Sequence, residues 1–554
     1  MPQPSPKPVA IDPAWPAYVA DFRAAGHAAV DWIAQYLEHT RDYPVLPSVT
    51  PGALVDQQPP SAPERGESFA ALLSEFDRAI MPAVVHWNHP AFFAYFGCTG
   101  STPAIIGEML AAALNTNGLH WKTSPAVAEL EQVTLAWLAE WMGLATPDQP
   151  NPWFGMVYDT ASTSSLHAIA CAREAAAPEA RVNGSTPGLV LYCSDQAHSS
   201  IEKGAIALGI GQKYVRKVPS DAQFRMDAAA LAKLIEADLA AGLRPFCVVA
   251  TVGTTSTASI DPVPAIADLA ERHQLWLHVD AAYAGAAAIV PELRHILAGV
   301  ERADSLVVNA HKWLLTPIDL SAFYTRRPEI LRRAFSLVPE YLRPQDDPRA
   351  HNLMDYGIPL GHRFRALKLW FVMRYFGRDR IVAMLRDHIA WAQQLAALVR
   401  DDPRFELAAP PSLSVVCFRY RGSRPHHAGV VPAASAGVVP AASAGMVPAA
   451  STGVVPAAST GVVPAASAGK SVRSTEEQNL RAKPSAAEPN TAAHSDDANR
   501  AILEAVNATG ETFLSNTVLN GRFVLRLAIG NLGTTWNDVE HAWHLLQQAA
   551  DRIA

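Results

Sequence analysis

Two apolar segments of the sequence each hold a residue that could carry out chemistry. The run "DSLVVNAHKWLL" (304–315) surrounds Lys312 with apolar side chains, although lysine is almost never buried without a partner. Such an amine either reaches the surface along its own stem or, when desolvated, becomes a nucleophile for carbonyl compounds. Asp280 follows the run "LWLHV" (275–279), where it either caps the next helix or directs a carboxylate at a cationic nitrogen.

Two further segments offer a ring and a phosphate-sized turn. His198, in "SDQAHSSIEKG" (194–204), is either a structural hydrogen-bonding residue or a flat ring that stacks on a flat ligand. Ala161 and Ser162 lie in "VYDTASTSSLHAIACA" (157–172), a turn of small residues that opens a helix. Its Ser and Thr residues either cap that helix or leave its backbone N–H groups open to a phosphate.

The order of these four features along the chain points to one cofactor. A phosphate turn, a stacking ring, an acid at a strand end and then a lysine together indicate a pyridoxal phosphate site. The lysine would bind the cofactor's aldehyde, and the acid would keep the pyridine nitrogen protonated so that the ring accepts electrons.

The elements that must position these residues alternate in type from about residue 125 to 325. Helical, alanine-rich stretches such as 226–242 separate short runs that are apolar on both faces, at 188–194, 245–253, 275–285 and 304–310. This pattern predicts an α/β domain with a mostly parallel sheet covered by helices on both sides. Ligands bind at the carboxyl ends of such strands, which is where the candidate residues fall.

Three domains are expected. Apolar spacing predicts helices at 16–39 and around 68–81 in an N-terminal helical arm, residues 1–85, that has little core of its own. A cofactor-binding α/β domain would span 86–380, and a long helix is expected at 362–377. A small C-terminal α+β domain would follow at 381–554.

The C-terminal domain contains an unusual insertion. Strands are expected near 412–422 and 521–531, but residues 428–467 between them are five tandem octads of the type "AGVVPAAS". Eight residues with one proline and no large side chain cannot bury a core, so 424–496 is expected to be a disordered insertion that folding does not need. Whether the octads have a role of their own is left open.

The overall composition excludes several classes of protein. A net charge of −7 over 554 residues and a pI near 6.3 give no basic surface for nucleic acid, and no apolar run is long enough to span a membrane. Five scattered cysteines without a CxxC pair argue against disulfides and against a metal site. The proline-rich N-terminus does not look like a signal peptide. A soluble cytoplasmic protein is therefore expected.

The chain resembles the group II pyridoxal-phosphate decarboxylases, and most of all the aromatic-L-amino-acid decarboxylases. The resemblance implies a type I, aspartate aminotransferase-like fold and a homodimer with its sites at the subunit interface. The supporting motifs are "MPAVVHWNHPAFFAYF" (81–96), "SPAVAELE" (124–131), "SDQAHSS" (194–200), "ATVGTTSTASIDPV" (250–263), "HVDAAYAG" (278–285), "NAHKWLL" (309–315) and "IPLGHRFRALKLWFVMRYFG" (358–377).

The resemblance also implies roles for individual residues. Lys312 matches the cofactor lysine, Asp280 the partner of the pyridine nitrogen, and His198 the residue that stacks on the ring and takes part in protonation. Tyr341 matches a catalytic-loop tyrosine. The further cofactor-binding positions are Ala161, Ser162, Thr255, Ala282, Asn309 and His311.

The predicted reaction is decarboxylation of an aromatic L-amino acid to its amine and CO2. An aromatic cluster with Trp87, Tyr95 and Phe96 lies where the family has its substrate pocket, and Gly361 leaves space for a large ring. Aldehyde synthesis on the same scaffold, decarboxylation of a non-aromatic acid such as glutamate, and a non-catalytic binding role are the alternatives. Tyrosine at 341 favours plain decarboxylation, because relatives that form aldehydes often have phenylalanine there. The identity of the amino acid is left open.

Overall fold

The computed structural model describes residues 14–145, 152–184, 186–337, 350–422 and 489–553. The chain divides into two compact units, one made of Met1–Ser423 with Ala492–Ala554 and the other of Arg424–Thr491. The first unit contains both β-sheets and every candidate site residue. The octads at 428–467 and the candidate Tyr341 lie outside the described residues.

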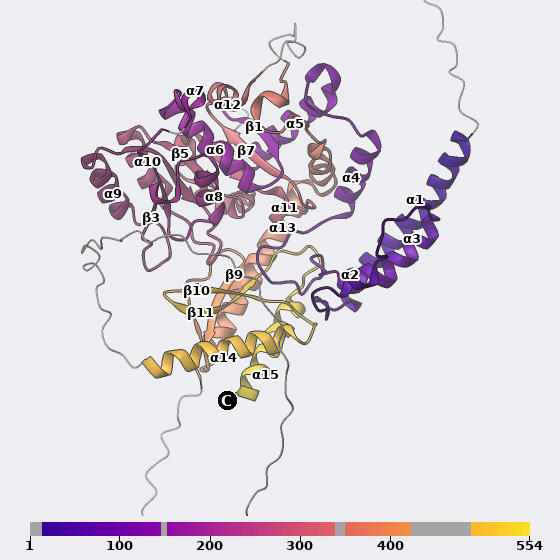
Figure 1. Ribbon diagram of the computed structural model, residues 1–554. Helices are drawn as coiled ribbons and strands as arrows, with labels where there is room; N and C mark the ends of the chain where they lie inside the picture. The colour runs from indigo at the N-terminus through magenta and orange to yellow at the C-terminus, as the bar shows by residue number, and fades with distance from the viewer. Residues whose placement is uncertain (1–13, 146–151, 185, 338–349, 423–488, 554) are drawn as a thin grey trace, which may run out of the picture. The chain divides into compact units, whose positions relative to one another are not determined.

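The larger sheet has seven strands in the order β1-β7-β6-β5-β4-β2-β3 (Figure 1). The pairs β2–β3, β2–β4, β4–β5 and β5–β6 are parallel, whereas β7 is antiparallel to both β6 and β1. This sheet confirms the predicted α/β fold with a mostly parallel centre. Its strands are β1 (Phe154–Tyr158), β2 (Leu189–Ser194), β3 (Val215–Val218), β4 (Arg244–Thr251), β5 (Trp276–Asp280), β6 (Ser305–Val308) and β7 (Ser321–Thr325).

Helices cover the larger sheet, and this explains why its central strands are apolar on both faces. Every residue of β2, β5, β6 and β7 is buried. The helices of this part are α4 (Thr102–Leu114), α5 (Pro125–Met142), α6 (Ala161–Ala176), α7 (Ala180–Asn183), α8 (Ser199–Ala207), α9 (Ala228–Ala240), α10 (Val263–His273), α11 (Ala310–Trp313) and α12 (Pro328–Phe335). Among them, α6, α8 and α11 begin just after the carboxyl ends of β1, β2 and β6.

A long helix joins the two sheets. Helix α13 (Arg365–Asp401) contacts α4 and α5 in its first part and the smaller sheet in its second part (Figure 1). It is interrupted at Gly377, whose φ of 65° lies in the left-handed region that glycine adopts readily. This break ends the first helical part where the sequence predicted, three residues before the expected domain boundary at 380.

The C-terminal domain is built on a four-stranded antiparallel sheet with its own hydrophobic core. Its strands, in the order β10-β11-β9-β8, are β8 (Phe405–Leu407), β9 (Val415–Tyr420), β10 (Ser515–Leu519) and β11 (Arg522–Ala528). Its helices are α14 (Pro489–Asn507) and α15 (Trp536–Ile553). Since α14 begins at Pro489, the end of the predicted insertion 424–496 is helical rather than disordered.

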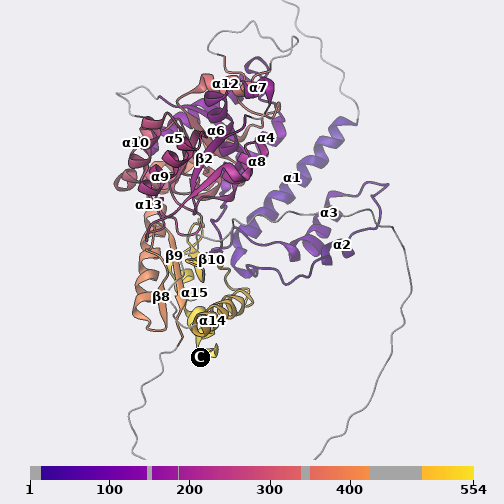
Figure 2. The same ribbon diagram turned by 60° about the vertical axis from the view of Figure 1, so that its left-hand side comes forward.

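The N-terminal arm is helical, as expected, and leaves large apolar side chains exposed. It contains α1 (Trp15–Glu38), α2 (Ala53–Gln57) and α3 (Phe69–Glu75), and α1 and α3 run beside each other (Figure 2). No residue of α1 is buried, and Trp15, Tyr18 and Phe22 are all more than half exposed. None of the described helices has an apolar stretch long enough to cross a membrane.

Candidate active site

The carboxyl ends of the parallel strands surround a cavity of about 180 Å3. All nine residues predicted to bind the cofactor line it, together with Phe96 from the predicted aromatic cluster. The full lining is Phe96, Thr160, Ala161, Ser162, His198, Thr251, Gly253, Thr255, Asp280, Ala282, Tyr283, Asn309, His311 and Lys312.

Lys312 lies in the single turn of α11 and borders the cavity. Its Nζ lies 5.3 Å from the centre of the Phe96 ring. Burial lowers the pKa of Lys312, and the positive charge of Arg526 adds to this, while Asp280 and Cys98 oppose it. The environment therefore favours a larger share of the neutral, nucleophilic amine than free lysine would have.

Asp280 is the last residue of β5 and is only 5% exposed. Its Oδ1 accepts a hydrogen bond from the Ala282 N–H at 3.1 Å, so the carboxylate is held in place by the turn that follows the strand. It also interacts electrostatically with Lys312 and His198. A buried carboxylate in a cavity suits a cationic partner, because an uncompensated buried charge is costly.

His198 is the N-cap residue of α8, and its orientation is fixed by that helix. Its Nδ1 accepts the Ser200 N–H at 3.2 Å and lies 2.8 Å from Ser200 Oγ. Burial lowers its pKa, helped by Lys312 and Lys203 and opposed by Asp280. A neutral ring anchored through one nitrogen, on the cavity wall, is suited to stacking on a flat ligand.

The N-terminus of α6, which borders the cavity, can hold an anion. Helix α6 begins at Ala161, its N-cap Thr160 makes no side-chain capping bond, and Ser162 follows in the first turn. Its free N–H groups and the helix dipole favour a phosphate there. Two side-chain atoms on the cavity wall, Thr251 Oγ1 and Asn309 Oδ1, are buried without a hydrogen-bond partner among the described residues. Such atoms are expected where a ligand completes the hydrogen bonding.

Aromatic rings form a continuous column beside Lys312. Phe96 stacks on Tyr283 with ring centres 3.7 Å apart, and Tyr283 stacks on Trp313 at 4.8 Å. The guanidinium of Arg526, which is 3% exposed, lies 4.6 Å from the centre of the Phe96 ring. The column fixes both Phe96 and the residue next to Lys312.

Known proteins match this chain over most of its length. A family model described as the pyridoxal-dependent decarboxylase conserved domain matches residues 51–421. The chain belongs to this family. An aromatic-L-amino-acid decarboxylase of Cavia porcellus is 42% identical over 418 residues, 73% of this chain and 86% of that protein. A tryptophan decarboxylase of Camptotheca acuminata is 35% identical over 546 residues, 96% of this chain and 95% of that protein.

A solved structure shows the same fold. The crystal structure of Oryza sativa TDC with PLP and tryptamine superposes with a TM-score of 0.82 at 34% identity, covering 96% of this chain and 98% of that one. The protein is therefore a pyridoxal phosphate-dependent decarboxylase, a lyase. Its cavity fits that cofactor, because it offers an amine for the aldehyde, a carboxylate for the ring nitrogen and a helix N-terminus for the phosphate.

Three of the predicted substrate residues do not line the decarboxylase cavity. Trp87 and Tyr95 are 38% and 55% exposed, and their rings stack on each other with centres 5.9 Å apart. Tyr95 has a positive φ of 54°, so the backbone turns sharply just before Phe96 enters the cavity wall. Gly361 lies in the loop before α13, near Asn117. Their assignment to a substrate pocket stays a prediction.

Sequence reasoning overlooked several residues of the decarboxylase site. Thr251 is the last residue of β4, so the strand-end rule that identified Asp280 would have found it as well. Tyr283 gave no such signal, because its role depends on Phe96 and Trp313 being brought together by the fold. Arg526 was detectable in principle, since "RFVLRLAIGN" places a charged residue in an apolar run as "VVNAHKWLL" does.

Proposed function

We propose that this enzyme decarboxylates an aromatic L-amino acid to the corresponding amine and CO2. The observation that carries the proposal is that Lys312, Asp280 and His198 line one cavity whose wall includes the ring of Phe96. The names of its relatives support the aromatic class of substrate, because they are an aromatic-L-amino-acid decarboxylase and a tryptophan decarboxylase.

We assign the following tasks to the protein in this reaction. Bound pyridoxal phosphate supplies an electron sink for the charge left at Cα when the carboxylate departs. Lys312 would hold the cofactor through its amine. Asp280 would keep a proton on the cofactor's ring nitrogen. His198 would stack on the ring and so help to orient the bound substrate.

Phosphate binding is assigned to the N-terminus of α6 with Ala161 and Ser162, and to Asn309 and His311, which line the same cavity. Burial lowers the pKa of His311 to about 4, so this ring stays neutral near pH 7. Thr255 and Ala282 contact the cofactor ring in this assignment. His198 is also proposed to take part in protonating Cα, and Tyr341, which lies outside the described residues, is proposed as the catalytic-loop tyrosine.

We further propose that the enzyme works as a cytoplasmic homodimer with its sites at the subunit interface. Exposed apolar side chains support a second copy as partner, because α1 presents Trp15, Tyr18 and Phe22, and α4 presents several more (Ile106, Met109, Leu110 and Leu114). Large exposed apolar side chains are typical of an interaction surface. The exposed Trp87 and Tyr95 would then complete the substrate pocket at this interface. Five free thiols are consistent with a reducing compartment.

The test is a substrate panel with the full-length protein and added pyridoxal phosphate. L-tryptophan, L-tyrosine, L-phenylalanine, L-3,4-dihydroxyphenylalanine and L-glutamate are supplied, and amine, CO2, hydrogen peroxide and ammonia are measured together. The proposal expects equal amounts of amine and CO2 from at least one aromatic acid. Peroxide and ammonia in step with CO2 would show an aldehyde synthase instead, and turnover of glutamate alone would reject the aromatic class.

A further inference from the structure

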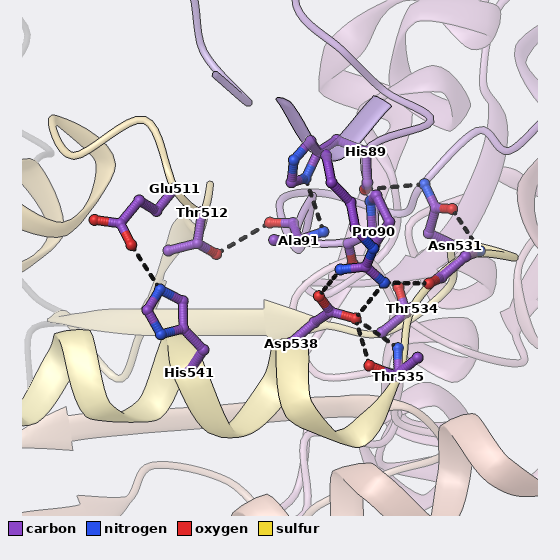
Figure 3. Close-up of polar contacts among 12 residues, drawn as sticks. His89, Pro90, Ala91, Glu511, Thr512, Asn531, Thr534, Thr535, Asp538 and His541 are labelled. Atoms are coloured by element: carbon purple, nitrogen blue, oxygen red, sulfur yellow. Dashed lines mark hydrogen bonds and ion pairs between the residues drawn. The ribbon is translucent and has the colours of Figure 1, made fainter. Parts of the chain in front are cut away.

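Asn531 contacts two segments of the chain that lead to different residues of the cavity wall. Asn531 lies in the loop between β11 and α15 and is 4% exposed. Its Nδ2 donates to the carbonyl oxygens of Trp87 at 3.0 Å and His89 at 3.1 Å, while its Oδ1 accepts the Gly533 N–H at 3.0 Å. The bond to His89 can be followed in Figure 3. The side chain therefore uses both of its donor hydrogens on the segment that leads into the aromatic cluster.

That segment takes most of its further backbone partners from the C-terminal domain as well. Thr534 Oγ1 donates to the Pro90 carbonyl at 2.6 Å, and Thr512 Oγ1 donates to the Ala91 carbonyl at 3.0 Å (Figure 3). The Phe93 N–H donates to the Phe513 carbonyl at 2.8 Å. Residues 87–93 are thus held from outside the large domain, and three residues later Phe96 forms part of the cavity wall.

The backbone of the same asparagine holds the other wall. The imidazole of His388 in α13 interacts with the Asn531 backbone, and its Nδ1 accepts the Trp313 Nε1–H at 3.0 Å. Burial lowers the pKa of His388 to about 4, so the ring stays neutral and Nδ1 remains available as an acceptor. Trp313 directly follows Lys312 and stacks on Tyr283. The chain of contacts therefore ends at the lysine.

We propose that Asn531 is a positioning residue of the decarboxylase site. Its side-chain amide fixes the segment that ends at Phe96, and its backbone fixes His388 and through it the helical turn of Lys312. Asn531 thereby fixes the position of the Phe96 ring relative to the amine of Lys312, although it does not itself line the cavity. The inference deepens the proposed function, since it explains how the aromatic wall and the lysine keep their mutual distance.

A matched pair of variants tests this. Asn531→Asp keeps the volume and the acceptor for Gly533, but it replaces an amide that donates two hydrogen bonds by a carboxylate facing two carbonyl oxygens. Asn499→Asp is the control, because Asn499 is also fully buried in the C-terminal domain, donates to the Tyr420 and Ser495 carbonyls, and accepts the Tyr420 N–H. Among the described residues, its side chain makes no hydrogen bond to the 87–96 segment or to His388.

Hydrogen exchange and kinetics are measured on the full-length holoenzymes. For Asn531→Asp, faster amide exchange is expected in both 89–96 and 310–316, with kcat/KM lowered between about tenfold and a hundredfold, as small misplacements of reacting groups produce. For Asn499→Asp, exchange should rise around 415–420 and 495–500, and kcat/KM should fall less than about threefold even if the melting temperature drops equally.

Two further variants keep the proposal testable if Asn531→Asp does not fold. Thr534→Val removes only the bond to the Pro90 carbonyl and should raise KM for an aromatic substrate more than it lowers kcat. His388→Phe keeps a ring in the column but leaves Trp313 Nε1 unpaired, and it should lower kcat more than it raises KM. The same split between the two variants is not expected from a general loss of stability.

The proposal is overturned if the exchange changes in Asn531→Asp stay within 529–535, or if Asn531→Asp and Asn499→Asp lose activity equally. It is also overturned if Thr534→Val and His388→Phe change kcat and KM in the same proportion. Wild-type enzyme that produces no aromatic amine would reject the proposed function, whereas the exchange pattern tests the role of Asn531 independently of turnover.

Discussion

Two lysines of this chain lie in apolar surroundings, and only one of them borders the cavity. Lys368 of α13 is 1% exposed, and its Nζ lies 3.0 Å from Glu108 Oε2. Lys312 has no carboxylate in ion-pair contact within the described part of the chain, although Asp280 acts on it through space. Burial is the largest cause of the lowered pKa in both.

The difference between the two lysines lies in what compensates the charge. Glu108 both interacts with and hydrogen-bonds the ammonium of Lys368, so a buried positive charge is satisfied and can stay. Around Lys312, Asp280 favours the charged amine whereas the positive charge of Arg526 disfavours it, and the amine borders the cavity. A paired buried lysine therefore serves the structure, whereas one left beside a cavity is available for chemistry.

The largest expected effect is that of Lys312→Ala. Removing the amine should abolish amine production from every amino acid tested, because no other described lysine lines the cavity. The protein should still fold, since the change removes a buried charge rather than a packed side chain. Loss of the visible absorption band of the bound cofactor, with an unchanged far-ultraviolet circular dichroism spectrum, checks this. Residual turnover above one tenth of the wild-type rate would contradict the role of Lys312.

Asp280→Asn should produce the next largest effect. The amide keeps the shape and can still accept the Ala282 N–H, but it cannot hold a proton on a ring nitrogen by charge. We expect kcat to fall by roughly 10²–10⁴-fold, the range in which a positioned proton contributes to catalysis. Steady-state amine formation measures this, and Asp261→Asn, at a buried carboxyl that accepts two backbone N–H groups, serves as the comparison. Equal losses in both variants would point to a structural role for Asp280.

The residues that form and support the cavity differ in how far the sequence predicted them. Lys312, Asp280, His198 and the α6 turn were found because each follows a strand in a local pattern, and parallel strand ends meet at one edge. Arg526 and Asn531 come from more than 200 residues further along the chain, and only the packing of the small domain brings them to the site. Periodicity within one segment carries no information about such contacts.

Acidification should lower the free energy of unfolding through the buried histidines. Burial lowers the pKa of four histidines to about 4, namely His167, His278, His311 and His388. The unfolded chain takes up these protons near pH 6.5, whereas the folded chain resists until about pH 4. The stability they contribute is therefore complete above pH 6.5 and is lost as the pH falls towards 4.

At pH 5 each of these histidines should cost about 2 kcal/mol of the free energy of unfolding. Asp261 acts in the opposite direction, because burial raises its pKa to about 6, but it offsets only about 1 kcal/mol at pH 5. Urea unfolding between pH 7.5 and 5 checks the sum. A free energy of unfolding that is constant over this range would mean that these rings are accessible to protons in the folded protein.

Lys368→Met should have the smallest effect on catalysis and a measurable one on stability. The variant removes the ammonium from Glu108 but leaves its ion pair with Arg363. Since the carboxylate is also one-third exposed, the loss should be about 1–3 kcal/mol rather than the 3–5 kcal/mol of a fully buried pair. Lys217→Met is the control, because Lys217 pairs with Glu202 at 3.4 Å near the surface and should lose less than about 1 kcal/mol. Amine formation per folded molecule should stay within about twofold of wild type in both. If Lys368→Met instead removed activity while the urea midpoint held, the paired lysine would belong to the site and the contrast with Lys312 would fail.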